Sequence, residues 1–242
     1  MCEAFEVSAP PPPPREVHLA DAMEWLAMHG PMEGCAFLTS LPDVSETGMS
    51  LERGRSWFVE AATRVCALLP PEGLALFVQT DLRKDGVWID KGALVAEGAA
   101  RAGAQLLCKK IVCRRPPGSR SSAGASFSSL LVYGRGRVLD PALPDLVPDV
   151  IVEPGPPTWV RGLGRDACAH AVRLVQRYAP SAHTVVDPFC GEGMTLAVAN
   201  ALGMRAVGVE RNRKRAEKAR TLVVAPEAIV SRVPSGESAR RR

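Results

Sequence analysis

The residues best suited to chemistry lie near the C-terminus, where an apolar run ends in a glycine turn. Residues 183–195 read HTVVDPFCGEGMT, so Asp187 closes the apolar run, and Gly191 and Gly193 follow it. In an open parallel sheet, ligands bind beyond the carboxyl ends of the strands. Glycines at such a turn let the backbone approach a ligand closely, and the next helix offers N–H donors at its N-terminus. The pattern therefore predicts a ligand-binding loop.

A second carboxylate follows at a suitable interval. Seventeen residues after Gly193, the apolar run 205–209 ends at Glu210. A carboxylate at the end of a neighbouring strand can accept hydrogen bonds from both hydroxyls of a ribose. The turn lacks the GxGxxG spacing, so a nicotinamide cofactor is a poor match.

Short apolar runs alternate with helical stretches along most of the chain, which predicts an α/β fold. Strands are expected at residues 16–19, 35–39, 74–79, 105–113, 130–133, 184–186 and 205–209. A turn that enters a short helix is expected at 21–26. Longer helices are expected at 56–69, 92–103, 166–178 and 194–202, with a last charged helix from Asn212. The prediction is a seven-stranded, mostly parallel sheet with helices on both faces.

The composition is that of an ordinary globular protein, since 46% of the 242 residues are hydrophobic and 23% are charged. The acidic, Pro-rich start is unlike a signal peptide, and no apolar run has membrane-spanning length. We therefore expect an intracellular protein, cytoplasmic or nuclear, without a membrane partner. The seven cysteines are scattered and form no CxxC pair. This pattern favours reduced thiols, and we predict no metal site.

Residues 187–212, DPFCGEGMTLAVANALGMRAVGVERN, resemble the cofactor-binding half of class I S-adenosyl-L-methionine (SAM)-dependent methyltransferases. The DPF-x-G-x-G form is typical of the DNA and RNA enzymes that methylate amino groups. The resemblance implies a Rossmann-like fold and SAM as the cofactor, with the glycine loop around its methionine part and Glu210 on its ribose. The implied cofactor-binding residues are Asp21, Ala22, Thr39, Asp187, Pro188, Phe189, Cys190, Gly191, Gly193, Thr195, Glu210 and Arg211.

The N-terminal half carries two further motifs of the same family. Residues 17–26, VHLADAMEWL, are similar to the third-strand motif, in which Asp21 contacts the adenine amino group; Asp21 also suits a plain helix cap. Residues 37–43, FLTSLPD, occupy the place of the catalytic tetrapeptide, which implies Ser40, Pro42 and Asp43 as the catalytic residues. Because these motifs precede the cofactor loop, the order resembles the circularly permuted, β-type arrangement.

The tetrapeptide departs from the family at its last position. Ser40 can accept an amino hydrogen and Pro42 keeps the turn stiff, but Asp43 replaces the aromatic ring that stacks on a flipped base. Two explanations stay open. Asp43 acts as an acceptor or general base toward a different nucleophile, or the site has lost catalysis. No Pro-Cys pair precedes the substrate pocket, which argues against methylation of a pyrimidine C5.

The resemblance organises the chain into one methyltransferase domain between two flexible ends. The expected parts are a disordered Pro-rich arm (1–15), the domain (16–223, with a catalytic half 16–137, a linker 138–160 and a cofactor-binding half 161–223) and a flexible basic tail (224–242). The linker is too short to hold the separate recognition domain that sequence-specific DNA enzymes of this arrangement carry.

The charge distribution points to a nucleic-acid substrate. The net charge is only +4, but no acidic residue occurs between Gly98 and Leu139, where eight residues are basic. We expect Arg114, Arg115 and Arg120 to form a basic rim at the mouth of the site that attracts a polyanion. The alternative is a solvated charged face. Without a recognition domain, we favour structured RNA over DNA, with a protein partner supplying further selectivity.

Two other functions fit the sequence. One is a catalytically inactive pseudo-methyltransferase that binds RNA or stabilises an active subunit. The other is a methyltransferase that acts on a small molecule or a protein, for which the basic rim is incidental.

Overall fold

The computed structural model describes residues 13–43, 48–121, 124–139, 147–160 and 162–229. Most of the predicted arm, residues 140–146 and 161, and residues 230–242 of the predicted tail lie outside the described residues.

The described residues form an eight-stranded sheet with the order β1-β10-β9-β2-β3-β7-β6-β8. The strands are β1 (Arg15–Leu19), β2 (Cys35–Thr39), β3 (Leu74–Gln79), β6 (Ala104–Cys113), β7 (Phe127–Arg135), β8 (Val150–Ile151), β9 (Thr184–Asp187) and β10 (Arg205–Glu210). The first five strands of that order are parallel to one another, β7 is antiparallel to both of its neighbours, and β6 is parallel to β8. The carboxyl ends of β1, β10, β9 and β2 therefore meet along one edge.

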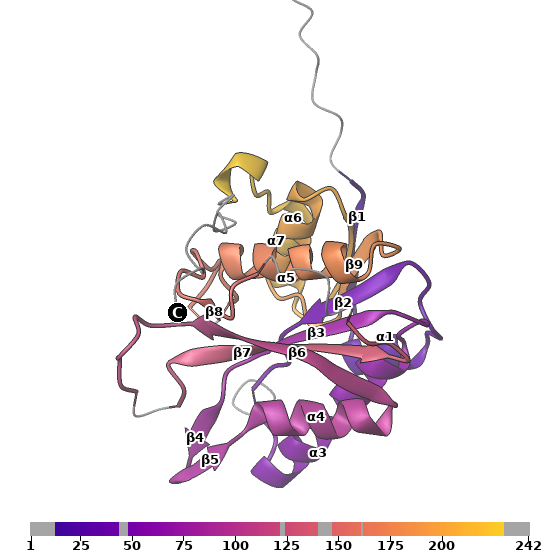
Figure 1. Ribbon diagram of the computed structural model, residues 1–242. Helices are drawn as coiled ribbons and strands as arrows, with labels where there is room; N and C mark the ends of the chain where they lie inside the picture. Colours follow the sequence, from indigo (N-terminus) through magenta and orange to yellow (C-terminus); the bar gives the residue numbers. More distant parts are fainter. Residues whose placement is uncertain (1–12, 44–47, 122–123, 140–146, 161, 230–242) are drawn as a thin grey trace, which may run out of the picture.

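The central strands are apolar because helices cover both of their faces. Every residue of β2, β3 and β9 is buried, as expected for parallel strands between two helical layers. The helices are α1 (Ala22–Ala27), α3 (Leu51–Ala67), α4 (Lys91–Arg101), α5 (Arg165–Tyr178), α6 (Met194–Ala201) and α7 (Arg213–Thr221), followed by a 3-10 turn η1 (Pro226–Ala228). Helices α5, α6 and α7 pack on one face and α1, α3 and α4 on the other (Figure 1).

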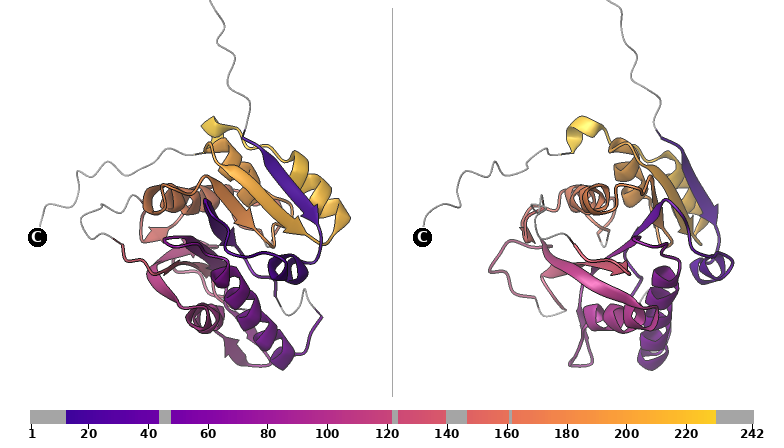
Figure 2. Two further views of the ribbon diagram at one scale, coloured as in Figure 1. Left: turned by 90° about the vertical axis from the view of Figure 1, so that its right-hand side faces the viewer. Right: turned by 45° about the vertical axis from the view of Figure 1, so that its right-hand side comes forward.

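Segments from the two ends of the sequence lie side by side. Strand β1 pairs in parallel with β10 along its whole length (Figure 2). Arg15 reinforces this pairing, because its guanidinium donates to the carbonyls of Ala219 and Leu222 at 2.9 and 2.6 Å and to the side-chain oxygen of Asn200 at 2.7 Å. The start of the chain is thus attached to the helices that follow the glycine turn.

The predicted α/β class and the seven predicted strands are confirmed, but the strand count is corrected to eight. The additional strand, β8, lies in the stretch 138–160 that the sequence analysis treats as a linker. A separate two-stranded sheet, β4 (Leu82–Lys84) with β5 (Val87–Ile89), is also missing from the prediction. Its turn is Asp85-Gly86, with both φ angles positive at 51° and 77°, which is the geometry of a tight hairpin.

No helix in the described ranges is both long enough and apolar enough to cross a membrane.

Helices α3 and α4 are packed closely at Gly98. A Cβ atom at this position would lie 2.5 Å from the carbonyl oxygen of Val59 and 2.7 Å from the Cβ of Ala62. Because both neighbours belong to a packed helix, we expect Gly98→Ala to lower the free energy of unfolding by about 1–3 kcal/mol. Urea denaturation measures the change. Gly30→Ala is the control, since a Cβ there meets no atom within 4 Å; equal effects of the two substitutions would contradict the packing argument.

Candidate cofactor-binding site

A cavity of about 460 Å³ opens at the carboxyl edge of the sheet. Four polar residues at neighbouring strand ends line this cavity. Glu210 and Asp187 are the last residues of β10 and β9, whereas Asp21 and Ser40 come just after β1 and β2. Neighbouring strands are ~4.8 Å apart, so the four strand ends, in the order β1, β10, β9 and β2, span about 14 Å. The volume lies in the range of small-molecule sites. The cavity is therefore a trough along four strand ends that suits an elongated ligand.

Most of the predicted site residues line the cavity. They are Asp21, Ala22, Ser40, Pro42, Asp187, Pro188, Phe189, Cys190, Gly191, Thr195, Glu210 and Arg211. Thr39, Asp43 and Gly193 do not, and neither do the three arginines of the predicted basic rim.

The two glycines of the turn have different roles. Gly191 has a φ of 54°, and a Cβ there would meet no atom within 4 Å, so its backbone borders open space in the cavity. Gly193 has a φ of 87°, and a Cβ there would lie 2.7 Å from the Cα of Ala219. Gly193 is therefore required for the close approach of α7, whereas Gly191 leaves room for a ligand.

Asp187 is buried and holds the start of the glycine loop by hydrogen bonds. Its Oδ1 accepts hydrogen bonds from the hydroxyl of Thr39 at 2.7 Å and from the backbone N–H of Phe189 at 3.1 Å. Burial raises the pKa of Asp187 from 3.8 to about 6, although hydrogen bonds from Thr39, Thr195 and Phe189 oppose the shift. Thr39 itself is buried and donates to this carboxylate; its predicted cofactor contact stays a prediction.

The two acidic residues at the other strand ends each use one oxygen to fix the local backbone. Oε1 of Glu210 accepts from the N–H of Asn212 at 2.7 Å. Oδ1 of Asp21 accepts from the N–H groups of Met23 and Glu24 at 2.8 and 3.2 Å, which caps α1. The capping role of Asp21 is confirmed, and its contact with adenine stays a prediction.

Asp43 lies outside the cavity, where it forms an ion pair with Lys91. Lys91 is buried at the start of α4, and its backbone N–H donates to Asp81 at 2.9 Å. The ammonium group of Lys91 thus pairs the Asp43 carboxylate with α4, and the catalytic role of Asp43 stays a prediction. Ser40 and Pro42 remain in the cavity wall.

The loop after β6 lies on the cavity side of the sheet, because β6 runs parallel to β3 through their shared neighbour β7. Arg114 donates to the carbonyl of Val160 at 3.2 Å, next to the cavity-lining Trp159. Surrounding protein atoms lower the pKa of Arg114, and the charge of Asp43 opposes that shift. Arg115 donates to the carbonyl of Arg120 at 3.3 Å within the same loop. Arg114 thus lies beside the cavity without lining it, and the basic rim formed with Arg115 and Arg120 stays a prediction.

Two tryptophans that were not predicted as site residues also line the cavity. Trp57, on α3, packs edge-on against Phe189, with ring centroids 5.7 Å apart. Trp159 lies under the guanidinium of Arg215, 4.8 Å from its ring centroid. A helical pattern marks Phe58 as core, but it does not show that the neighbouring Trp57 faces a ligand site.

Comparisons with known proteins agree with this architecture. Residues 168–221 match the model of a family described as DNA methylase. Among curated proteins, no sequence matches the chain significantly. A protein of Thermus thermophilus described as a DNA modification methylase, solved in complex with S-adenosyl-L-methionine, aligns with a TM-score of 0.64 and 22% identity. The alignment covers 85% of this chain and 91% of that one.

Two further solved structures have the same fold. The PvuII DNA methyltransferase, described as cytosine-N4-specific, aligns with a TM-score of 0.65 and 15% identity over 88% of this chain and 89% of its own. The M1.HpyAVI protein, solved with SAM, gives a TM-score of 0.58 and 14% identity over 85% of this chain and 97% of its own. The chain therefore has the Rossmann-like fold of class I methyltransferases, as predicted.

The pKa of Asp187 makes the stability of the protein depend on pH. A carboxyl group whose folded pKa is raised stabilises the fold below about pH 4, and this contribution is lost as the pH rises through 6. We expect Asp187→Asn to remove that loss, so that the mutant gains about 3 kcal/mol relative to wild type between pH 4 and 7. Urea unfolding of both proteins without cofactor, at several pH values, gives the difference. Parallel pH profiles would contradict the raised pKa.

Proposed function

We propose that the chain is a SAM-dependent methyltransferase that acts on an exocyclic amino group of a base in DNA. One observation carries the proposal. A single cavity joins the glycine loop, Glu210 and Asp21 to Ser40 and Pro42. The cofactor residues and the residues of the proposed reaction centre thus share one space.

The residues along the trough fit the parts of SAM. Glu210 accepts hydrogen bonds from the ribose, and Asp21 lies one strand further out for the adenine amino group. The open backbone at Gly191 borders the methionine part. When bound, SAM supplies a methyl group on a positively charged sulfur, and the loop after β9 directs this end toward the end of β2.

Ser40 and the backbone after it provide the reaction centre. The hydroxyl of Ser40 and the carbonyl of Leu41 accept the two hydrogens of an amino group and thereby orient its lone pair toward the methyl group. Pro42 fixes the direction of the chain. Asp43 holds the end of this segment in place through its ion pair with Lys91 of α4.

DNA replaces RNA as the preferred substrate. The matching family, the Thermus thermophilus protein and the PvuII methyltransferase are all described as acting on DNA. The preference for RNA rests only on the expected lack of a recognition domain. The basic loop with Arg114, Arg115 and Arg120 suits the phosphates of either polymer. A protein partner that adds sequence selectivity stays a prediction, as does an intracellular location.

The chain order is consistent with the permuted arrangement. Ser40 follows β2 in the first quarter of the sequence, and the glycine loop follows β9 near its end, yet β2 and β9 are neighbours in the sheet. We infer a permuted, β-type enzyme whose loops, rather than a separate domain, contact the substrate.

An inactive pseudo-methyltransferase remains the second candidate function. The observation in its favour is the ion pair that keeps Asp43 out of the cavity, at the position where the related enzymes have an aromatic ring.

Binding of SAM tests the cofactor proposal directly. We expect Glu210→Gln to weaken SAM about tenfold or more in calorimetry, because the amide keeps one acceptor for Asn212 but loses the charge that holds the ribose hydroxyls. Glu217→Ala on the exposed face of α7 is the control and should bind as wild type does. Absence of SAM binding in the wild-type protein would reject the proposal.

Methyl transfer separates the active enzyme from the pseudoenzyme. With labelled SAM and unmethylated plasmid DNA, we expect the wild-type protein to transfer label to DNA and to prefer it over total cellular RNA. Ser40→Ala should lower kcat/KM by roughly 100-fold, because one preorganised acceptor is lost, while SAM affinity stays unchanged. Ser56→Ala on the exposed side of α3 is the control. SAM binding without transfer to either polymer would favour the pseudoenzyme.

A further inference from the structure

The end of the cavity beside β2 lacks the aromatic ring expected at position 43. Asp43 occupies that position and is paired with Lys91 outside the cavity. A flipped base needs an apolar or aromatic surface to replace the stacking energy that it loses on leaving a helix. If the proposed function holds, another side chain must supply this surface.

Trp57 lines the same cavity as Ser40, Pro42 and Met49. It comes from α3, the helix that follows β2 and Ser40 in the chain. The next residue, Phe58, is 4% exposed and belongs to the core, whereas Trp57 is only half-buried. The helix thus places a large aromatic side chain beside its core-facing stripe, at the boundary with the cavity.

The contact between Trp57 and Phe189 shapes this end of the cavity. The two ring planes meet at 76° with centroids 5.7 Å apart. Two rings at such an angle form a corner rather than a stack, so a planar ligand can lie flat against one ring and meet the other with its edge. Phe189 belongs to the loop that follows Asp187, which places the corner between the cofactor loop and the β2 end.

The third aromatic residue in the cavity wall has a different environment. Trp159 is covered by the guanidinium of Arg215 at 4.8 Å. Arg215 belongs to α7, which follows Glu210, so a cation from the helix after β10 covers this ring. Among the described aromatic residues that line the cavity, Trp57 and Phe189 are therefore the two without a cation over the ring, and Trp57 offers the larger ring.

We infer that Trp57, on α3, stacks on the target base. It thereby has the role that an aromatic ring at position 43 has in related enzymes. This inference rests on the proposed function and adds a specificity-determining residue to it. The order along the sheet edge is then adenine, ribose and methionine of the cofactor, followed by the target base between Ser40 and Trp57.

A fluorescent base tests the stacking without requiring catalysis. The probe is a single-stranded thymine 15-mer with one central 2-aminopurine, titrated with protein in the presence of S-adenosylhomocysteine. We expect the wild-type protein to quench the 2-aminopurine. Trp57→Leu should abolish the quenching and weaken binding of the probe about tenfold, in the range measured for loss of one base–aromatic stack. Trp57→Phe should restore most of both effects.

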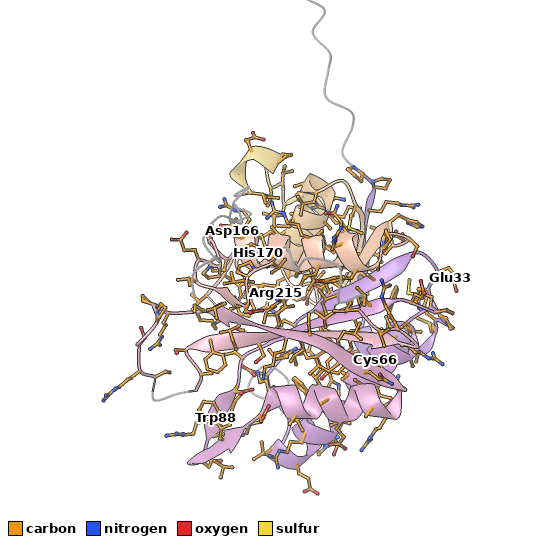
Figure 3. The ribbon with its side chains drawn as sticks, viewed as in Figure 1. Glu33, Cys66, Trp88, Asp166, His170 and Arg215 are labelled. Carbon is orange, nitrogen blue, oxygen red and sulfur yellow. The ribbon has the colours of Figure 1, made fainter. Side chains whose placement is uncertain are left out.

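Trp88→Leu is the matched control. Trp88 is 42% exposed on the β4–β5 hairpin, where Arg83 lies over its ring. It is far from Arg215, which lines the cavity (Figure 3). The Trp88→Leu variant should bind the probe and quench the 2-aminopurine as the wild-type protein does. Thermal unfolding of each variant, with SAM calorimetry, identifies a variant that is merely misfolded, and Trp57→Phe then carries the comparison.

The outcomes separate this inference from the proposed function. Quenching that is absent in wild type, or unchanged in Trp57→Leu, overturns the stacking role even if the protein methylates DNA. Quenching that depends on an aromatic residue at position 57 supports it, and this result holds even if the wild-type protein transfers no methyl group.

Discussion

A buried hydrogen bond between Thr39 and Asp187 connects the two parts of the site. The donor closes β2 and the acceptor closes β9, so 148 residues of sequence separate two side chains that are 2.7 Å apart. Ser40 directly follows the donor, and the glycine loop directly follows the acceptor. This one contact therefore fixes the proposed reaction centre relative to the proposed cofactor loop. It requires the two strands to end within one residue of each other, which their parallel register provides.

The remaining structure can be understood as support for that contact. Apolar residues on both faces of β2 and β9 bury the pair and raise the pKa of Asp187. Gly193 lets α7 approach the loop, and Arg15 ties β1 to the end of α7. A desolvated carboxylate that accepts several hydrogen bonds holds its donors in place more firmly than an exposed one does, because no water competes for them.

The sequence predicted the parts of this design that depend on local pattern. The apolar strands, the amphipathic α5 and the glycine turn each have their signal within about ten residues, and all of them are observed. The hairpin at Asp85-Gly86 also has a local signal that the prediction missed. By contrast, the partner of Asp43 is 48 residues away, and the placement of Trp57 depends on how α3 packs beside Phe189. Such contacts follow from tertiary packing, which no spacing in the sequence encodes.

Asp43 places a charge beside α4 that the surrounding structure must balance. A carboxylate beside buried groups needs a counter-charge. Lys91 provides it, and its own side chain is only 8% exposed. Replacing Asp43 alone would leave the buried ammonium group of Lys91 poorly compensated. The pair therefore links the end of the segment 40–43 to α4 by charge, and under the proposed function the surface for a planar base comes from a different element.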